Sequence, residues 1–73
     1  MTSYRFTVVV EQDEDGVYIA SCPALQGCYS QGNTYEEAVN NVRDAIHLHI
    51  EARRDVGEPV PIEVAIDRVE ISA

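Results

Sequence analysis

Two cysteines, two histidines and a cluster of carboxylates are the side chains of this 73-residue sequence whose types suit chemistry. Five residues separate Cys22 from Cys28, whereas a redox pair is normally Cys-x-x-Cys at a helix N-terminus, where the dipole lowers a thiol pKa. A structural zinc site needs four ligands, and His47 and His49, two positions apart on a predicted helix, point in different directions. Neither histidine has a nucleophile or an orienting carboxylate at local spacing, so a catalytic triad is not supported. We expect both cysteines to be buried as small hydrophobic residues at strand ends.

The carboxylates of the first predicted turn are Glu11, Asp13, Glu14 and Asp15. Adjacent carboxylates bind Mg²⁺ or Ca²⁺ in some proteins, but this spacing lacks the alternation of a calcium loop, and polar turns are commonly acidic. A solvated turn is the favoured interpretation. The alternative is a residual nuclease that uses this cluster and Asp67 with Mg²⁺, which would require carboxylates to converge from separate strands. We therefore expect no catalytic residue, no metal site and no cofactor.

The charge balance is strongly acidic. The chain contains thirteen Asp and Glu residues and only five basic residues, all of them Arg, which gives a net charge of -8. Such a surface repels phosphate, because nucleic-acid binders depend on cationic contacts. It suits a basic protein partner, or it only keeps a small protein in solution.

The length predicts a single domain over residues 1–73. A chain of this size buries only about 60% of the surface that its unfolded form exposes, so self-association is the expected stabiliser. No apolar run approaches the roughly 20 residues that span a bilayer, and the chain does not open on a secretory leader. We expect a cytoplasmic protein with reduced thiols.

The hydrophobic pattern predicts three strands before a helix. Residues 4–11 alternate, with Tyr4, Phe6, Val8 and Val10 on one face, and a hairpin turn over residues 12–16 follows. Residues 17–22 are the second strand, residues 23–27 a loop and residues 28–31 a short third strand. The face that the helix leaves open is expected to carry Val9, Tyr18 and Ala20.

The helix start is marked by Thr34 as a cap and by Glu37, which completes a capping box. An apolar stripe at helical spacing follows; it consists of Tyr35, Ala38, Val39, Val42, Ala45, Ile46, His49 and Ile50. Gly57 and the Pro59–Pro61 segment are predicted to end the helix.

Residues 62–71 are predicted to form the last strand, whose pattern changes phase midway. Ile62, Val64 and Ile66 share one face, and Val69 and Ile71 have the opposite parity. A bulge near residues 67–68 would explain the change, and so would a strand whose second half meets another subunit. The order β-β-β-α-β predicts an α+β fold, a single sheet with one helix packed on one face.

Taken in order, the motifs resemble those of the HicB-like antitoxin family. The resemblance is carried by the segments EDGVYIASCPALQGCYSQGNTYEEAVNNVRDAI and GEPVP. Its pattern is a Gly-x-Tyr strand start, a Cys-Pro-x-Leu-x-Gly-Cys turn, a Gly-x-Thr-x-x-Glu-Ala helix start and a Pro-x-Pro exit. The matching positions are Gly16, Tyr18, Cys22, Pro23, Leu25, Gly27, Cys28, Gly32, Thr34, Glu37, Ala38, Pro59 and Pro61.

The resemblance implies a truncated RNase H-like fold that serves as the antitoxin of a type II toxin–antitoxin pair. Its partner would be a small basic HicA-type ribonuclease that cleaves mRNA with a histidine, and the antitoxin would bind it and mask its active site. Many family members append a helix-turn-helix or ribbon-helix-helix segment that binds DNA. This chain stops soon after the last predicted strand, so we expect neither an appended DNA-binding domain nor direct DNA binding.

The acidic side chains are the predicted contacts to the partner: Glu11, Asp13, Glu14, Asp15, Glu36, Asp44 and Glu51. Charge complementarity to a basic ribonuclease motivates this choice. The alternative function is an orphan homo-oligomeric interaction module, a dimer or tetramer held by strand or sheet-face pairing and without a dedicated toxin.

Overall fold

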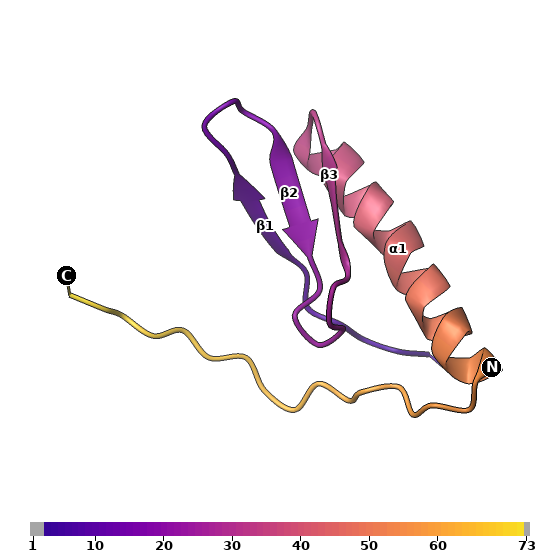
Figure 1. The fold of residues 1–73 in the computed structure, drawn as a ribbon. Coiled ribbons are helices and arrows are strands. Elements are labelled where there is room, and N and C mark those ends of the chain that lie inside the picture. Colours follow the sequence, from indigo (N-terminus) through magenta and orange to yellow (C-terminus); the bar gives the residue numbers. More distant parts are fainter. Residues whose placement is uncertain (1–2, 73) are drawn as a thin grey trace.

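The computed structural model describes residues 3–72, which form one antiparallel sheet with a helix on one face (Figure 1). The elements are β1 (Val9–Gln12), β2 (Tyr18–Ser21), β3 (Tyr29–Gly32) and α1 (Tyr35–Asp55). The strands lie in the order β1-β2-β3. The predicted α+β class is confirmed, and the description as a truncated RNase H-like fold stays a prediction.

One carboxylate organises the turn between β1 and β2. Asp13 Oδ1 accepts hydrogen bonds from the backbone N–H of Asp15 at 2.9 Å and of Val17 at 3.0 Å. The Asp13 N–H donates to the Val17 carbonyl at 3.0 Å. Gly16 has a φ of 83°, a conformation in which a side chain is strained. Asp13 therefore stabilises this turn in the way that Asx turns do.

The strand register corrects the predicted assignment of the sheet faces. Val10 pairs with Ala20, and Ala20 is completely buried beneath the helix, with Tyr18 packed against the same cluster. The prediction that Tyr18 and Ala20 share the open face with Val9 is therefore wrong. Ile19 lies on the open face instead, because successive side chains of a strand alternate. The β1–β2 turn determines which residues of the two strands pair. A shift of this pairing by one residue moves every side chain of a strand to the opposite face of the sheet.

Two small clusters form the core between the sheet and the helix. The first contains Ala20, Ala38 and Val42, with Val8, Val10 and Tyr18 packed against it. The second contains Cys22, Leu25 and Cys28, with Phe6, Ala24, Ala45 and Ile46 packed against it. The predicted helix stripe is confirmed apart from Tyr35, which is 57% exposed in the first turn.

The helix begins in close contact with β3. Thr34 Oγ1 accepts the N–H of Glu37 at 3.1 Å, as predicted. The Glu37 carboxylate accepts from Asn33 at 3.4 Å, one residue before the cap, so the reciprocal half of the capping box is displaced. A Cβ on Gly32 would lie 2.6 Å from the Ala38 nitrogen. The helix therefore approaches β3 more closely than any side chain at position 32 allows.

The helix ends in a Schellman motif, as the glycine predicts. Gly57 has a φ of 74° and donates to the Arg54 carbonyl at 3.2 Å, and Glu58 donates to the Arg53 carbonyl at 2.8 Å. Arg53 Nη1 then donates to the Pro59 carbonyl at 2.9 Å. These bonds direct the chain away from the helix axis.

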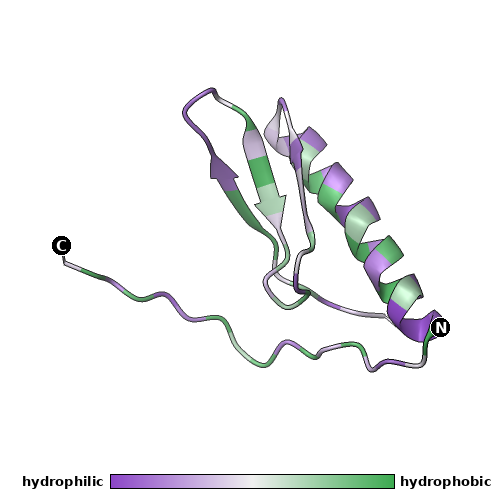
Figure 2. Cartoon of the chain, viewed as in Figure 1, coloured by the Kyte–Doolittle hydropathy of each residue, from purple (hydrophilic) through white to green (hydrophobic). Residues whose placement is uncertain are grey.

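Residues 58–72, the C-terminal tail, correct the prediction of a last strand over residues 62–71. They form neither strand nor helix and run past the end of the sheet opposite the β1–β2 turn (Figure 1). Apolar and polar residues alternate along the tail (Figure 2), and Ile62 and Val64 are 87% and 94% exposed. Glu63 accepts the Thr7 N–H at 2.7 Å and also a bond from its hydroxyl. The residues of the tail favour an extended strand, but a strand forms only when its backbone pairs with that of a neighbouring strand.

Replacing Gly32 by Ala is expected to lower the free energy of unfolding by about 1–3 kcal/mol, because the helix start must move to admit the new Cβ. Gly27→Ala is the matched control. Its Cβ would meet nothing within 4 Å, so the cost is that of the positive φ alone, about 1 kcal/mol. Urea unfolding followed by circular dichroism measures both. A loss at position 32 no larger than that at position 27 would contradict the close approach.

Candidate functional site

The segment between the two cysteines is built from two consecutive turns that share Leu25. The Leu25 N–H donates to the Cys22 carbonyl at 3.1 Å, and the Cys28 N–H donates to the Leu25 carbonyl at 3.1 Å. Pro23 occupies the second position of the first turn, which suits its fixed φ, and Gly27 occupies the third position of the second turn with a φ of 75°. A bond of 2.9 Å from the Cys22 N–H to the Cys28 carbonyl closes the loop. The motif thus specifies a backbone shape.

Both cysteines are free thiols buried in the core, with exposed fractions of 1% for Cys22 and 7% for Cys28. Burial raises the pKa of both thiols, and the charge of Glu63 acts in the same direction on Cys22. Leu25, 1% exposed, packs between them. The prediction that the cysteines are buried small residues at strand ends is confirmed.

The two histidines have different environments. His49 is half-buried and its Nε2 accepts a hydrogen bond from Arg53 Nε at 2.8 Å, which agrees with the predicted packed histidine. His47 is exposed and lines a groove described below. Within residues 3–72, no three His, Cys, Asp or Glu side chains cluster closely enough to hold a metal ion.

The strand register gathers most of the predicted partner contacts at one end of the molecule. Gln12 pairs with Tyr18, and Tyr18 pairs with Gly32, so the β1–β2 turn and the start of α1 lie at the same end of the sheet (Figure 1). We call this surface the acidic end; its residues are Glu11, Asp13, Glu14, Asp15 and Glu36, all of them exposed. Five of the seven predicted contacts thus lie together.

The other two predicted contacts lie farther along the helix. Asp44 and Glu51 are exposed and follow Glu36 by eight and fifteen residues, or about 12 and 22 Å along the axis. Asp67 belongs to the tail, which passes the opposite end of the sheet (Figure 1). The structure therefore does not bring Asp67 to Asp13, as the nuclease alternative requires.

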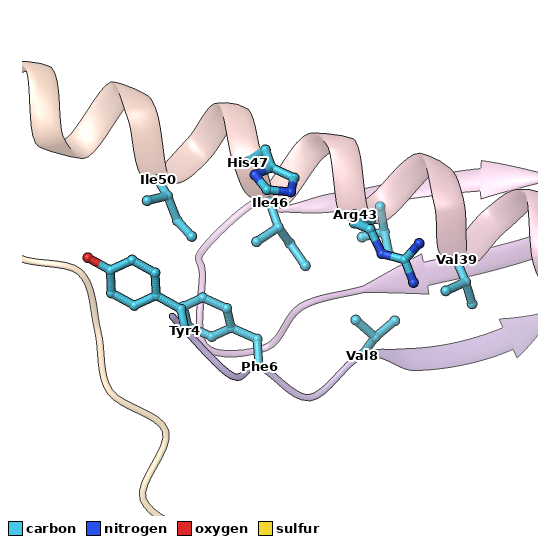
Figure 3. Close-up of a pocket in the computed structure, with 9 residues that line it drawn as sticks. Tyr4, Phe6, Val8, Val39, Arg43, Ile46, His47 and Ile50 are labelled. Carbon is cyan, nitrogen blue, oxygen red and sulfur yellow. The ribbon is translucent and has the colours of Figure 1, made fainter. Parts of the chain in front are cut away.

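An apolar groove opens between the N-terminal segment and α1. Its volume is about 370 Å³. Tyr4 and Phe6, whose ring centroids are 6.2 Å apart, form its floor with Val8, and Figure 3 shows their side chains facing the helix. The helix side carries Val39, Arg43, Ile46, His47 and Ile50. The apolar groove exists because α1 packs mainly on β3 and β2 and least on β1.

Sequence reasoning found the apolar residues of this groove but not the groove itself. The alternation of Tyr4, Phe6 and Val8 and the helix stripe both predicted buried faces. Neither pattern predicts over which strands of the sheet the helix packs. The sequence offered one signal: it contains more apolar side chains on its predicted strands than a single helix can cover.

The cysteines are expected to react slowly with Ellman's reagent in the folded protein at neutral pH, because burial raises each thiol pKa and leaves little thiolate. The same chain in urea provides the control and should react at the rate of exposed cysteine. Reaction in the folded state should accelerate only as the pH rises above the ordinary range of a thiol. Equal rates in the folded and unfolded chain would contradict the packing role.

Within residues 3–72, no helix combines the length and the hydrophobicity that crossing a membrane requires.

Comparison with known proteins finds relatives of this chain among the UPF0150 proteins. A UPF0150 protein of Synechocystis sp. is 50% identical over 60 residues, which are 82% of this chain and 76% of the relative. A UPF0150 protein of Thermoplasma acidophilum is 42% identical over 57 residues, 78% and 83% of the two chains.

The fold also matches a solved structure. The crystal structure of the N-terminal domain of the Burkholderia pseudomallei antitoxin HicB has a TM-score of 0.73 and 33% sequence identity to this chain. The match covers 84% of this chain and 72% of that domain chain. The model of the HicB-like antitoxins of bacterial toxin–antitoxin systems matches residues 6–72. The chain therefore belongs to the HicB-like antitoxin family.

Proposed function

We propose that this protein is an antitoxin that binds a small basic HicA-type ribonuclease and masks its active site, without catalysis of its own. The observation that carries the proposal is the family match over residues 6–72. That range includes every residue of the acidic end, the apolar groove from Phe6 onward, and the tail to Ser72.

The electrostatics support binding to an RNA-cleaving partner. A ribonuclease holds the phosphates of RNA with cationic side chains, and the chain carries a net charge of -8. The exposed carboxylates of the acidic end offer the same charge and the same acceptor oxygens as a phosphate backbone. They would compete with mRNA for those cations and steer the two proteins together.

The residues of the acidic end have separable roles. Asp13 Oδ1 is engaged within the turn, so Asp13 positions its neighbours as well as contributing charge. Glu11, Glu14 and Asp15 are the proposed contacts to Arg or Lys of the ribonuclease. Asp44 and Glu51 extend the negative surface along the helix and would act at longer range.

The proposal includes three further expectations. The two proteins meet in the cytoplasm, where the mRNA substrate is. The chain acts as one domain without direct DNA binding. It self-associates as a dimer or tetramer, because the two core clusters contain only six buried residues and a small core leaves a single copy marginally stable.

An orphan homo-oligomeric module is the second candidate function. The exposed apolar side chains of the tail favour it, because they suit association of any kind. A short basic reading frame beside this gene favours the antitoxin, and its absence favours the orphan module.

Co-expression tests the proposed function directly. The neighbouring basic protein alone should arrest growth and degrade mRNA, and this chain should restore growth when both are induced. A catalytically inactive histidine variant of the neighbour controls for toxicity unrelated to RNA cleavage. Arrest that persists when both proteins are present at equal levels would reject the antitoxin function.

Charge reversal tests the contact surface. Glu11→Lys with Glu14→Lys is expected to lower the association rate constant for the ribonuclease about tenfold at low ionic strength and to flatten its salt dependence, since steering is lost. Asp44→Lys with Glu51→Lys changes the net charge equally and is the matched control. Stopped-flow fluorescence measures both. A smaller effect at the acidic end than along the helix would show that the contact lies elsewhere.

A further inference from the structure

We propose that two copies of this chain exchange their C-terminal tails. Ile62, Val64 and Ile66 of each copy would enter the apolar groove of the other, with the tail paired along residues 4–8, the segment that leads into the edge strand β1. This inference rests on the self-association included in the proposed function and specifies the surfaces that produce it.

The tail has the features of a strand without a neighbour. Ile62, Val64 and Ile66 alternate along it and are 87%, 94% and 67% exposed. A row of exposed apolar side chains at period two is uncommon on a protein that acts as a monomer. It is typical of a segment that is buried against a sheet in the assembled protein.

The apolar groove and β1 offer the complementary surface. β1 lies at one edge of the sheet, and edge strands present backbone groups that pair readily with an added strand. The offset of α1 leaves room above this edge, where Tyr4, Phe6 and Val8 face the helix (Figure 3). These three residues repeat at the same i, i+2, i+4 spacing as the three apolar residues of the tail.

Within one copy, the Thr7 N–H and hydroxyl already donate to Glu63, and the exchange would form the same contact between copies. Each of these polar residues lies between two apolar residues of its own segment. If Glu63 of one copy lies opposite Thr7 of the other, the apolar neighbours of both residues face the helix together. The polar pair then faces away from the groove, as sheet alternation requires.

The geometry of the tail favours a second copy over its own β1. The tail crosses the end of its own sheet and continues outward (Figure 1). Residues 62–66 contain none of the residues that dominate turns, which are Gly, Pro, Asn, Asp and Ser, so a sharp bend back along β1 is disfavoured within this segment. The radius of gyration is 13.9 Å, against about 11 Å for a compact chain of this length. A straight tail reaches another molecule without bending.

The association between copies and the binding of the ribonuclease should depend on salt in opposite ways. Two copies, each with a net charge of -8, repel one another, and salt screens that repulsion. Tail exchange should therefore strengthen as salt is added. Binding to a basic ribonuclease should weaken under the same conditions, so the failure of one proposal is distinguishable from the failure of the other.

Sedimentation analysis of the full chain without any ribonuclease tests the exchange. The unaltered chain should form a dimer or a larger even-numbered assembly. Val64→Glu should raise the dissociation constant about 100-fold or more, because its carboxylate would lose water against the apolar floor of Tyr4, Phe6 and Val8. Val69→Glu is the matched control. Val69 is also in the tail and 77% exposed but has the opposite parity, so the constant should change by no more than about twofold.

Circular dichroism verifies that both variants keep the helix and sheet, which the exposed positions of Val64 and Val69 predict. A chain that remains monomeric at all accessible concentrations would overturn the proposal. Assembly that Val64→Glu and Val69→Glu weaken equally, or that neither weakens, would overturn it as well, because association would then use another surface. Assembly that weakens with added salt would also contradict an apolar exchange.

Discussion

The close approach of α1 to β3 at Gly32 determines where the helix lies and, through it, what each surface of the molecule does. Because position 32 has no side chain, the helix start can rest on the end of β3, and the Thr34 cap fixes its direction there. The helix then covers β3 and β2 and leaves the side of β1 open. The apolar groove is a direct consequence of this offset. A helix centred over the sheet would cover Tyr4, Phe6 and Val8 and leave no apolar groove beside them.

The same arrangement separates two surfaces by their physical character. The turn of the first hairpin and the helix start meet at one end, where exposed carboxylates gather around a backbone held by Asp13. The apolar groove lies between α1 and the segment that leads into β1, and the tail passes the opposite end of the sheet (Figure 1). A charged surface suits a rapid encounter with a basic partner, whereas an apolar edge suits association between copies. The loop from Cys22 to Cys28 fills the part of the core against which Phe6, Ala45 and Ile46 pack.

Local features of the sequence predicted most of the helices, strands and turns. They failed for properties that depend on how these elements pack together. Capping at Thr34, the glycine exit at Gly57 and the turn at Gly16 depend on a few neighbouring residues, so their motifs were informative. The faces of Tyr18 and Ala20 depend on the pairing register, which strand periodicity leaves open. The tail shows the same limit, because its alternation predicts a strand, yet within one copy the straight segment crosses the end of the sheet and contacts Thr7 through the Glu63 side chain instead of forming a ladder. The clustering of Glu36 with the hairpin carboxylates also required the fold, since at least twenty residues separate Glu36 from each of them.

The central claim is that the acidic end binds the ribonuclease while the tail and the apolar groove join copies of the antitoxin. Amide hydrogen exchange of this chain, measured alone and with a catalytically inactive ribonuclease, tests both halves in one experiment. The account predicts that amides of residues 62–66 are protected in the chain alone and stay protected in the complex. Amides of residues 13–17 should gain protection only when the ribonuclease is added. Unchanged exchange at residues 13–17 in a saturated complex, or tail amides that become protected only with the ribonuclease, would contradict the account.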